Sequence, residues 1–387
     1  MRIALVNSMP LGKRAKRLYP LALLKIGAWR KSLGDECEIF EATLPQPGEF
    51  DEIWITTVFT YHIPYALGLV KEAKKRADTV RVGGTAASLM PDNFERAGAI
   101  VHKGLLPDAE KFSPDYSLLK STPTYSITHT SRGCIRKCKF CMVRTLEPEF
   151  KNRPNWKQDL YPGAPTILFY DNNWLAKDKS AFMQDVKELH NVVKTMGITN
   201  IDFNQGLDAR LMTEKIADAL AGLPMRYVRF AFDGKQEDGY YQKAVRMMAA
   251  RGFYKFTSYV LYNFMDTPED FYYRLRTSVE LTEELHADVF SFPMRYQPIM
   301  EIDPKRAHVG KHWSSAALKG FASLRSAHSF GGTISPRTLE QFEYWFGKDA
   351  AEFIKTINYP RVRELAQKRK GNLRIKRAQK ANKNNTA

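Results

Sequence analysis

The chain is poor in cysteine and has no apolar stretch long enough to cross a bilayer. Only four of its 387 residues are cysteine, and no run approaches the roughly 20 apolar residues that a membrane-spanning helix needs. The first residues, MRIALVNSMP, enter a strand-like run directly and lack the regions that make up a signal peptide. These features argue against a disulfide-stabilised secreted domain and against a membrane protein, and we therefore expect a cytoplasmic location.

Acidic residues are scarce relative to basic ones, and the imbalance is concentrated at the carboxyl end. The chain has 59 Lys and Arg against 42 Asp and Glu, a net charge of +17. Residues 361–387 contain ten of the basic residues and a single acid, Glu364. Such a basic tail is compatible with nucleic-acid binding through phosphates and equally with a solvated end that has no partner.

Strand-like and helical segments alternate along most of the chain, which predicts an α/β protein with parallel sheets. Residues 1–120 are expected to form a Rossmann-like doubly wound domain, with strands at 2–7, 37–42, 52–59 and 79–84 and helices at 21–32 and 64–76. Residues 121–300 predict a partial (β/α)6 TIM-type barrel, with strands at 125–130, 166–170, 200–204, 226–232, 255–261 and 288–293. A helical region at 301–360 and the basic tail at 361–387 complete the predicted domains.

Three of the four cysteines lie within eight residues, directly after the first strand of the predicted barrel. Cys134, Cys138 and Cys141 have the spacing Cys-x3-Cys-x2-Cys in the segment TSRGCIRKCKFCMV. Three thiolates suit an iron–sulfur cluster or zinc. A structural zinc needs a fourth ligand, for which only Cys37 or His129 is at hand, whereas a [4Fe–4S] cluster on three cysteines leaves one iron open to substrate or cofactor. Nearby basic residues are expected to lower the thiolate pKa values, namely Arg132, Arg136, Lys137 and Lys139.

The three cysteines form the motif Cys-x3-Cys-x-aromatic-Cys, with Phe140 as the aromatic residue. This motif, placed after the first strand of a predicted six-unit barrel, resembles that of the radical S-adenosylmethionine (SAM) superfamily. The resemblance covers about residues 121–300. It implies a [4Fe–4S] cluster whose open iron binds the amino and carboxylate groups of SAM. It also implies reductive cleavage of SAM to a 5′-deoxyadenosyl radical that abstracts hydrogen from a substrate, with the electron supplied by a flavodoxin- or ferredoxin-type donor.

Polar residues follow successive strands of the predicted barrel, at the end where such barrels carry their chemistry. In the superfamily the second strand usually brings polar groups to the SAM ammonium through Gly-Gly-Glu, which this chain lacks. The third strand carries a dense polar set suited to the SAM carboxylate and ribose or to the substrate, although a pairing of Asp208 with Arg210 that caps the next helix is the alternative. The predicted SAM-binding residues are Asp171, Asn172 and Asn173, then Asn204, Gln205, Asp208 and Arg210, and finally Asp233.

Residues 1–120 resemble the cobalamin-binding-like domain that precedes the barrel in many radical SAM enzymes. The similarity rests on three segments, at 10–31, 56–75 and 82–91. It implies that Gly83 and Gly84 permit close backbone approach to the nucleotide tail of cobalamin. The Asp-x-His-x-x-Gly motif that supplies a lower axial histidine is missing from the sequence. A docking or substrate-covering domain without cobalamin is the alternative.

The scarcity of cysteine narrows the predicted chemistry to a single cluster. Methylthiotransferases carry three further cysteines in the first domain, and enzymes with auxiliary clusters carry more after the barrel, yet no cysteine follows Cys141. The sequence therefore predicts a single-cluster radical SAM enzyme acting on an unknown substrate, with cobalamin-dependent methylation as one form of that chemistry. Two alternatives stay open: a cobalamin-independent radical modification of a nucleic acid or its precursor, and a non-catalytic iron–sulfur or zinc protein that binds nucleic acid.

Overall fold

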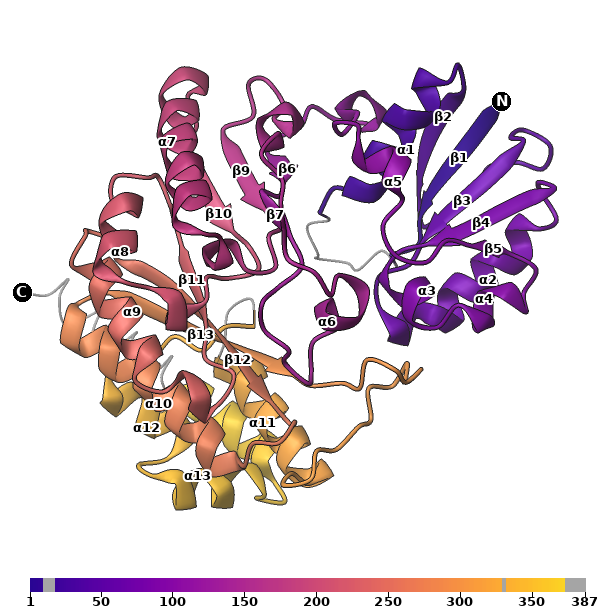
Figure 1. The fold of residues 1–387 in the computed structure, drawn as a ribbon. Coiled ribbons are helices and arrows are strands. Elements are labelled where there is room, and N and C mark those ends of the chain that lie inside the picture. The colour runs from indigo at the N-terminus through magenta and orange to yellow at the C-terminus, as the bar shows by residue number, and fades with distance from the viewer. Residues whose placement is uncertain (10–17, 329–331, 373–387) are drawn as a thin grey trace, which may run out of the picture. The chain divides into compact units, whose positions relative to one another are not determined.

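The computed structural model describes residues 1–9, 18–328 and 332–372 (Figure 1). Their contacts divide them into two compact units. The first unit comprises 1–173, 188–201 and 297–308, and the second comprises 174–187, 202–296 and the described residues from 309 onward. Within the described ranges, no helix is long and apolar enough to cross a membrane. The domain boundaries expected at 120 and 300 stay predictions.

Five parallel strands form the main sheet of the first unit, in the order β2-β1-β3-β4-β5. This is the flavodoxin-like form of the doubly wound arrangement, in which ligands bind beyond the carboxyl ends of the strands. The predicted fold of the amino-terminal region is confirmed. The strands are β1 (Arg2–Asn7), β2 (Glu36–Glu41), β3 (Glu52–Thr56), β4 (Thr79–Gly83) and β5 (Ile100–Val101).

Helices cover both faces of this sheet, because alternate side chains of its strands point to opposite sides. In β1, Ala4 and Val6 belong to the core shared with α2 (Ile63–Ala73), whereas Ile3 and Leu5 pack with α1 (Leu21–Ser32). The apolar run at 3–6 is therefore buried on both faces. Figure 1 shows the short helices α3 and α4 on the α2 side and α5 on the α1 side; their bounds are α3 (Thr85–Leu89), α4 (Asp92–Glu95) and α5 (Pro107–Glu110).

Six further strands follow at the predicted positions, and hydrogen bonding groups them into two three-stranded sheets of order β10-β9-β6 and β11-β12-β13. A parallel bridge between Leu207 and Phe230 and an ion pair between Asp202 and Arg229 join the end of β10 to β11. The predicted α/β barrel strands are confirmed, with bounds β6 (Ser126–Thr128), β9 (Thr166–Phe169), β10 (Asn200–Phe203), β11 (Val228–Ala231), β12 (Lys255–Tyr262) and β13 (Asp288–Arg295).

The helices between these strands start where the sequence provides caps. The hydroxyl of Thr267 accepts from the Asp270 amide and the Asp270 carboxylate accepts from the Thr267 amide, a capping box that opens α10 with Pro268 in its first turn. The Thr213 hydroxyl caps α8 by accepting from the Ile216 amide, without a reciprocal side-chain bond. The helices are α7 (Lys179–Met196), α8 (Glu214–Leu220), α9 (Tyr240–Ala249) and α10 (Pro268–Leu285).

Three helices near the carboxyl end pack on α10 around an apolar core that includes Phe271, Phe321 and Phe353. Gly320 lets α11 approach α13 closely, because any Cβ at this position would overlap the Ile357 carbonyl. These helices are α11 (Ser315–His328), α12 (Leu339–Phe346) and α13 (Ala350–Ile357). The expectation that 301–360 is helical is wrong for its first part. Residues 301–308 are irregular and belong to the first unit, where Ile302 packs against the sheet core.

The described part of the predicted basic tail is a packed helix. Residues 362–372 are helical, Ala366 is buried in the core of the second unit, and Arg369 donates to the Trp345 carbonyl at 2.6 Å. The Arg369 carbonyl in turn accepts from the Tyr344 hydroxyl. This part of the chain therefore belongs to the folded unit, and residues 373–387 lie outside the described residues, as do residues 10–17 of the first predicted cobalamin-related segment.

Candidate functional site

The cysteine loop is closed at its base by a short two-stranded pairing. Strand β7 (Ser131–Arg132) runs antiparallel to β8 (Lys151–Asn152), so residues 133–150 form an excursion from the end of β6. Gly133 opens this excursion with φ of +74°, and any side chain there would overlap the Glu149 carbonyl. Only glycine fits this close approach, which places Cys134 directly at the start of the loop.

The three cysteines follow one another along this loop, ahead of the one-turn helix α6 (Val143–Leu146). All three are partly exposed and none forms a disulfide. The Cys134 sulfur accepts from the Arg136 amide at 3.3 Å, and the Cys141 amide donates to the Cys138 carbonyl at 3.1 Å. In the described part of the chain, no three His, Cys, Asp or Glu side chains converge where one metal ion would sit. Three thiols on one loop are a suitable donor set for a [4Fe–4S] cluster, in which each thiolate binds a separate iron.

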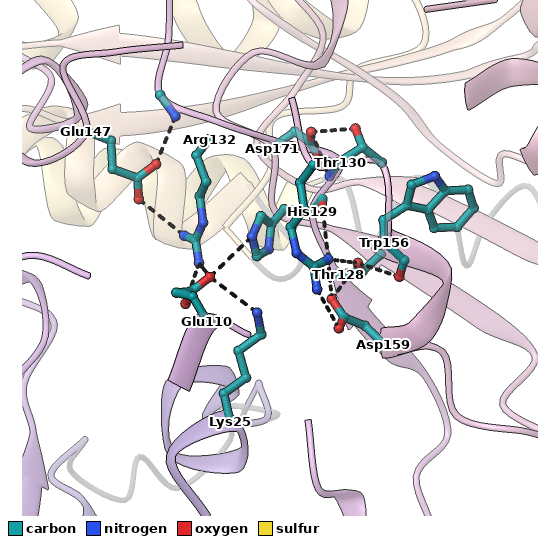
Figure 2. Close-up of polar contacts among 12 residues, drawn as sticks. Lys25, Glu110, Thr128, His129, Thr130, Arg132, Glu147, Trp156, Asp159 and Asp171 are labelled. Carbon is teal, nitrogen blue, oxygen red and sulfur yellow. Dashed lines mark hydrogen bonds and ion pairs between the residues drawn. The ribbon is translucent and has the colours of Figure 1, made fainter. Parts of the chain in front are cut away.

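Asp171, which follows β9, holds the start of the cysteine loop. Its carboxylate is buried, and both of its oxygens lie 3.0 Å from the Thr130 amide nitrogen, which donates to them (Figure 2). The carboxylate also accepts hydrogen bonds from the Thr130 hydroxyl at 2.7 Å and from the Ser131 hydroxyl at 2.6 Å. Hydrogen bonds to a carboxylate are strong and directional. The arrangement gives Asp171 a positioning role at the loop, and its contact with SAM stays a prediction.

The two asparagines after Asp171 also reach this loop. Asn172 Nδ2 donates to Glu147 Oε2 at 3.1 Å, and Asn173 Nδ2 lies 3.6 Å from the Cys134 sulfur. The structure thus brings the polar end of the second barrel strand to the first cysteine. Their contact with SAM stays a prediction.

A buried ion pair anchors the strand that leads into the loop. Both Asp159 oxygens bind Arg153, at 2.6 and 2.8 Å, and Asp159 Oδ2 also accepts from the Thr128 hydroxyl at 2.9 Å (Figure 2). The Arg153 guanidinium further donates to the His129 carbonyl at 3.2 Å. Because Asp159 is almost completely buried, this paired arrangement fixes the end of β6.

A chain of alternating charges runs from helix α1 to the cysteine loop. Lys25 Nζ lies 3.3 Å from Glu110, and Glu110 binds Arg132 Nη2 with both oxygens at 3.0 Å (Figure 2). Arg132 Nη1 reaches Glu147 at 3.2 Å, and Glu147 accepts from the Gly133 amide at 2.9 Å. Arg132 was expected to act on the thiolates, but its positive charge is balanced by two carboxylates.

Burial and these contacts shift the pKa values of Glu110 and Lys25. Burial alone would raise the pKa of Glu110, but the Arg132 and Lys25 cations outweigh it, so the pKa of this carboxyl is lowered. Burial lowers the pKa of Lys25, and the attraction of Glu110 opposes that change. His129, the other candidate zinc ligand, is buried with its Nε2 3.7 Å from Glu110.

A cavity of about 510 Å³ lies within the first unit, beside this charged chain. Its walls come from α1, from the carboxyl ends of β3 and β4, and from the 104–106 loop and α5. The cysteine loop contributes Arg132, Leu146 and Glu147 to the same wall. The cavity therefore extends from the ligand-binding edge of a doubly wound sheet to the base of the loop that carries the three cysteines.

Gly83 and Gly84 both line this cavity. Gly83 is paired in register with Thr56, and it shares its face of the sheet with Arg81, which also lines the cavity. A Cβ at Gly83 would meet only the His102 carbonyl, at 3.9 Å. A larger side chain at this position would consequently project on the cavity face.

Gly84 is required by the protein backbone itself. Its φ is +95°, and a Cβ there would lie 2.5 Å from the Thr57 carbonyl oxygen and 2.9 Å from the Thr56 hydroxyl. The sequence suggested that both glycines serve a ligand; for Gly84 the local chain packing is already a sufficient reason.

The polar residues after β10 form a connected group in the second unit. Arg210 binds Asp208 through Nε at 2.7 Å and Nη2 at 3.2 Å, and its Nη1 binds Glu237 at 3.0 Å. Asp208 also accepts from the Arg210 amide, so it caps the short helical turn at 209–211. The alternative of a capping pair thus describes the observed contacts. The Asn204 carbonyl accepts from the Tyr259 hydroxyl at 2.7 Å, and Gln205 is exposed.

Asp233 follows β11 as predicted, and one of its oxygens accepts from the Leu261 amide at 3.1 Å. Burial, reinforced by the negative charge of Glu237, raises the pKa of Asp233 to about 7, although Arg274 opposes the shift. Arg274 itself binds the Asp266 carboxylate and three backbone carbonyls. Burial thus favours the protonated form of the Asp233 carboxyl.

Sequence reasoning missed the charged chain, because its contacting members are 15 to 85 positions apart and meet only in the folded protein. One local signal existed in Lys25, which interrupts the apolar stretch LALLKIGA of helix α1. A lysine on the buried side of an amphipathic helix is rarely tolerated without a partner. That signal predicts a buried acid but not that Glu110 supplies it.

Comparison with known proteins gives matches in structure alone. No protein-family model matches the sequence, and no curated protein matches it. The radical S-adenosylmethionine methyltransferase TsrM from Kitasatospora setae, solved with cobalamin and a [4Fe-4S] cluster bound, is similar at a TM-score of 0.58 and 14% identity, over 77% of either chain. The same enzyme solved with tryptophan substrate and a SAM analogue matches at 0.58 and 15% identity, over 77% of this chain and 75% of that one.

These comparisons place the chain among proteins with the fold of a radical SAM methyltransferase. The predicted fold class is confirmed, and the resemblance drawn from the cysteine motif and the amino-terminal segments holds at the level of the fold. The ligands described for TsrM are cobalamin, a cluster, tryptophan and a SAM analogue. None of these is a nucleic acid, so the similarity gives no support to nucleic-acid binding by the basic tail.

Proposed function

We propose that this protein is a radical SAM enzyme with one [4Fe–4S] cluster and a corrinoid cofactor, and that it transfers a methyl group from SAM to its substrate. The observation that carries the proposal is the cavity at the carboxyl edge of the flavodoxin-like sheet, whose wall includes Arg132, Leu146 and Glu147 of the cysteine loop. The similarity to a cobalamin-containing methyltransferase supports the same assignment.

In this proposal Cys134, Cys138 and Cys141 hold the cluster, and the cavity beside Gly83 receives part of the corrinoid. When bound, the cluster supplies the iron that binds SAM together with the electron for SAM cleavage, and the corrinoid supplies a methyl carrier. An electron-donor protein of the flavodoxin or ferredoxin type completes the proposed system. The protein's own contribution is to fix the loop, which Asp171 does through Thr130 and Ser131.

The proposal is tested by SAM turnover in the anaerobic, cluster-containing protein. The protein is incubated with SAM and a strong reductant, with and without hydroxocobalamin, and S-adenosylhomocysteine and 5′-deoxyadenosine are quantified. Consumption of SAM that requires both the cluster and the corrinoid supports the proposal. Turnover that is unchanged without corrinoid would instead favour a cobalamin-independent radical enzyme, and no turnover would favour a binding protein.

A Gly83→Leu substitution is expected to weaken hydroxocobalamin binding at least about tenfold while the cluster is retained. The leucine side chain would project from the face of the sheet on which Thr56 of β3 and Arg81 of β4 line the cavity, and overfilling a packed site typically costs about 1–3 kcal/mol. Binding is measured by equilibrium dialysis with absorbance detection, and iron is quantified in the same samples.

Gly68→Leu is the matched control. Gly68 lies in α2, has open space where its Cβ would be, and is not part of the cavity wall. Corrinoid affinity in this variant should equal that of the wild type. Equal affinity in the Gly83→Leu protein would place the corrinoid elsewhere.

A further inference from the structure

The Lys25 ammonium is buried in the cavity wall with too few acceptors. Its side chain is about 1% exposed, and among the described residues its nitrogen has one hydrogen-bond acceptor, Glu110 Oε2 at 3.3 Å. A lysine ammonium carries three N–H donors. A buried charged group whose donors lack acceptors destabilises the folded protein, so we expect a hydrogen-bond acceptor for the remaining donors of Lys25.

Arg132, at the base of the cysteine loop, also has a buried N–H donor without an acceptor among the described residues. Its two terminal nitrogens bind Glu110 and Glu147, but its Nε is buried and has no hydrogen-bond partner within the described chain. Lys25 and Arg132 both line the cavity, as does the Glu110 that lies between them. The missing acceptors can therefore be supplied by a molecule that occupies the cavity.

The local charge indicates what kind of acceptor fits. Two cations, Lys25 and Arg132, are balanced by two carboxylates, Glu110 and Glu147. An anionic ligand oxygen near Lys25 would stand close to the Glu110 carboxylate, and like charges in a buried site repel strongly. A neutral carbonyl oxygen satisfies the donors without adding charge.

We propose that Lys25 and Arg132 donate hydrogen bonds to carboxamide oxygens of the corrinoid, and not to the phosphate of its nucleotide tail. The assignment rests on the proposed function and adds to it the chemical group that this wall recognises. A corrin ring carries primary carboxamides around its edge, and these are present both in cobalamin and in cobinamide, which has no nucleotide tail.

The test compares Lys25→Met with the wild type in binding hydroxocobalamin and dicyanocobinamide. A hydrogen bond from a charged donor contributes about 1.5–3 kcal/mol, so Kd for both ligands is expected to rise roughly ten- to hundredfold. Lys31→Met is the control, because Lys31 lies on the same helix but pairs with Asp115 outside the cavity. Its affinities should match the wild type, and iron content verifies folding of every variant.

Each outcome decides the assignment. An equal loss of affinity for both corrinoids in Lys25→Met supports carboxamide recognition. A loss of affinity confined to hydroxocobalamin would point to the phosphate-bearing tail and overturn the carboxamide assignment. Unchanged binding of both would overturn it as well. If Lys25→Met does not fold, Lys25→Gln decides in its place, since its amide keeps donors but no charge and a smaller loss is expected. A wild type that binds neither corrinoid contradicts the proposed function itself.

Discussion

Replacing Cys134, Cys138 or Cys141 by alanine is expected to reduce the iron content of the anaerobic protein from about four per chain to less than about one. The three thiolates lie on one loop that β7 and β8 close at its base. A cluster left with two protein ligands has two unprotected irons and is lost during purification. Iron and sulfide are quantified after anaerobic reconstitution, and the cluster absorbance is recorded on the same samples.

Cys37→Ala is the matched control for this result. Cys37 lies in β2 of the amino-terminal sheet, and burial raises the pKa of its thiol to about 11, so it stays protonated at neutral pH. Iron content should be unchanged in this variant. Full cluster retention in Cys138→Ala, or zinc in place of iron in the wild type, would contradict the assignment of the loop.

Replacing Asp159 by alanine is expected to destabilise the protein by about 3–5 kcal/mol, because a buried cation then loses its carboxylate. Arg153 binds both Asp159 oxygens and is itself mostly buried. The Thr128 hydroxyl loses an acceptor at the same time, at the end of the strand that leads into the cysteine loop. The change is measured by urea denaturation of the full-length protein, with cluster yield followed in parallel.

Glu72→Ala provides the comparison with a surface pair. Glu72 contacts Lys75 across one turn of exposed chain, and such pairs contribute about 0–1 kcal/mol. Its unfolding midpoint should stay close to that of the wild type. If Asp159→Ala shifts the midpoint no further than Glu72→Ala does, the pair does not hold this strand in place.

The strands and helices could be predicted closely because their signals are local. The apolar run at 3–6 is buried on both faces of the sheet, and Thr267 with Asp270 caps α10 directly before a proline. The short strand β5 was missed, since two residues carry no periodicity. The irregular segment at 301–308 was expected to be helical, but it is held by packing with residues far away in sequence, including Ile302 on the sheet core.

The parts of the candidate site that could be predicted are those whose residues lie close together in the sequence or directly after a predicted strand. The cysteine spacing is such a signal, and the position of Asp171 after the second barrel strand is another. What Asp171 binds depends on how β9 pairs with β6, which brings it to Thr130. The contacts of Lys25, Glu110 and Arg132 likewise arise only when α1, α5 and the cysteine loop come together, so their cavity could not be inferred from the sequence.

In the proposed arrangement, one folded unit holds a cluster and a corrinoid around a shared wall. The most direct test of this arrangement is to measure iron and cobalt together in the wild-type protein after anaerobic reconstitution with iron, sulfide and hydroxocobalamin, followed by removal of unbound ligand. We expect about four irons and about one cobalt per chain, with much less cobalt bound in Gly83→Leu and the iron retained. Iron without cobalt in the wild type would contradict it.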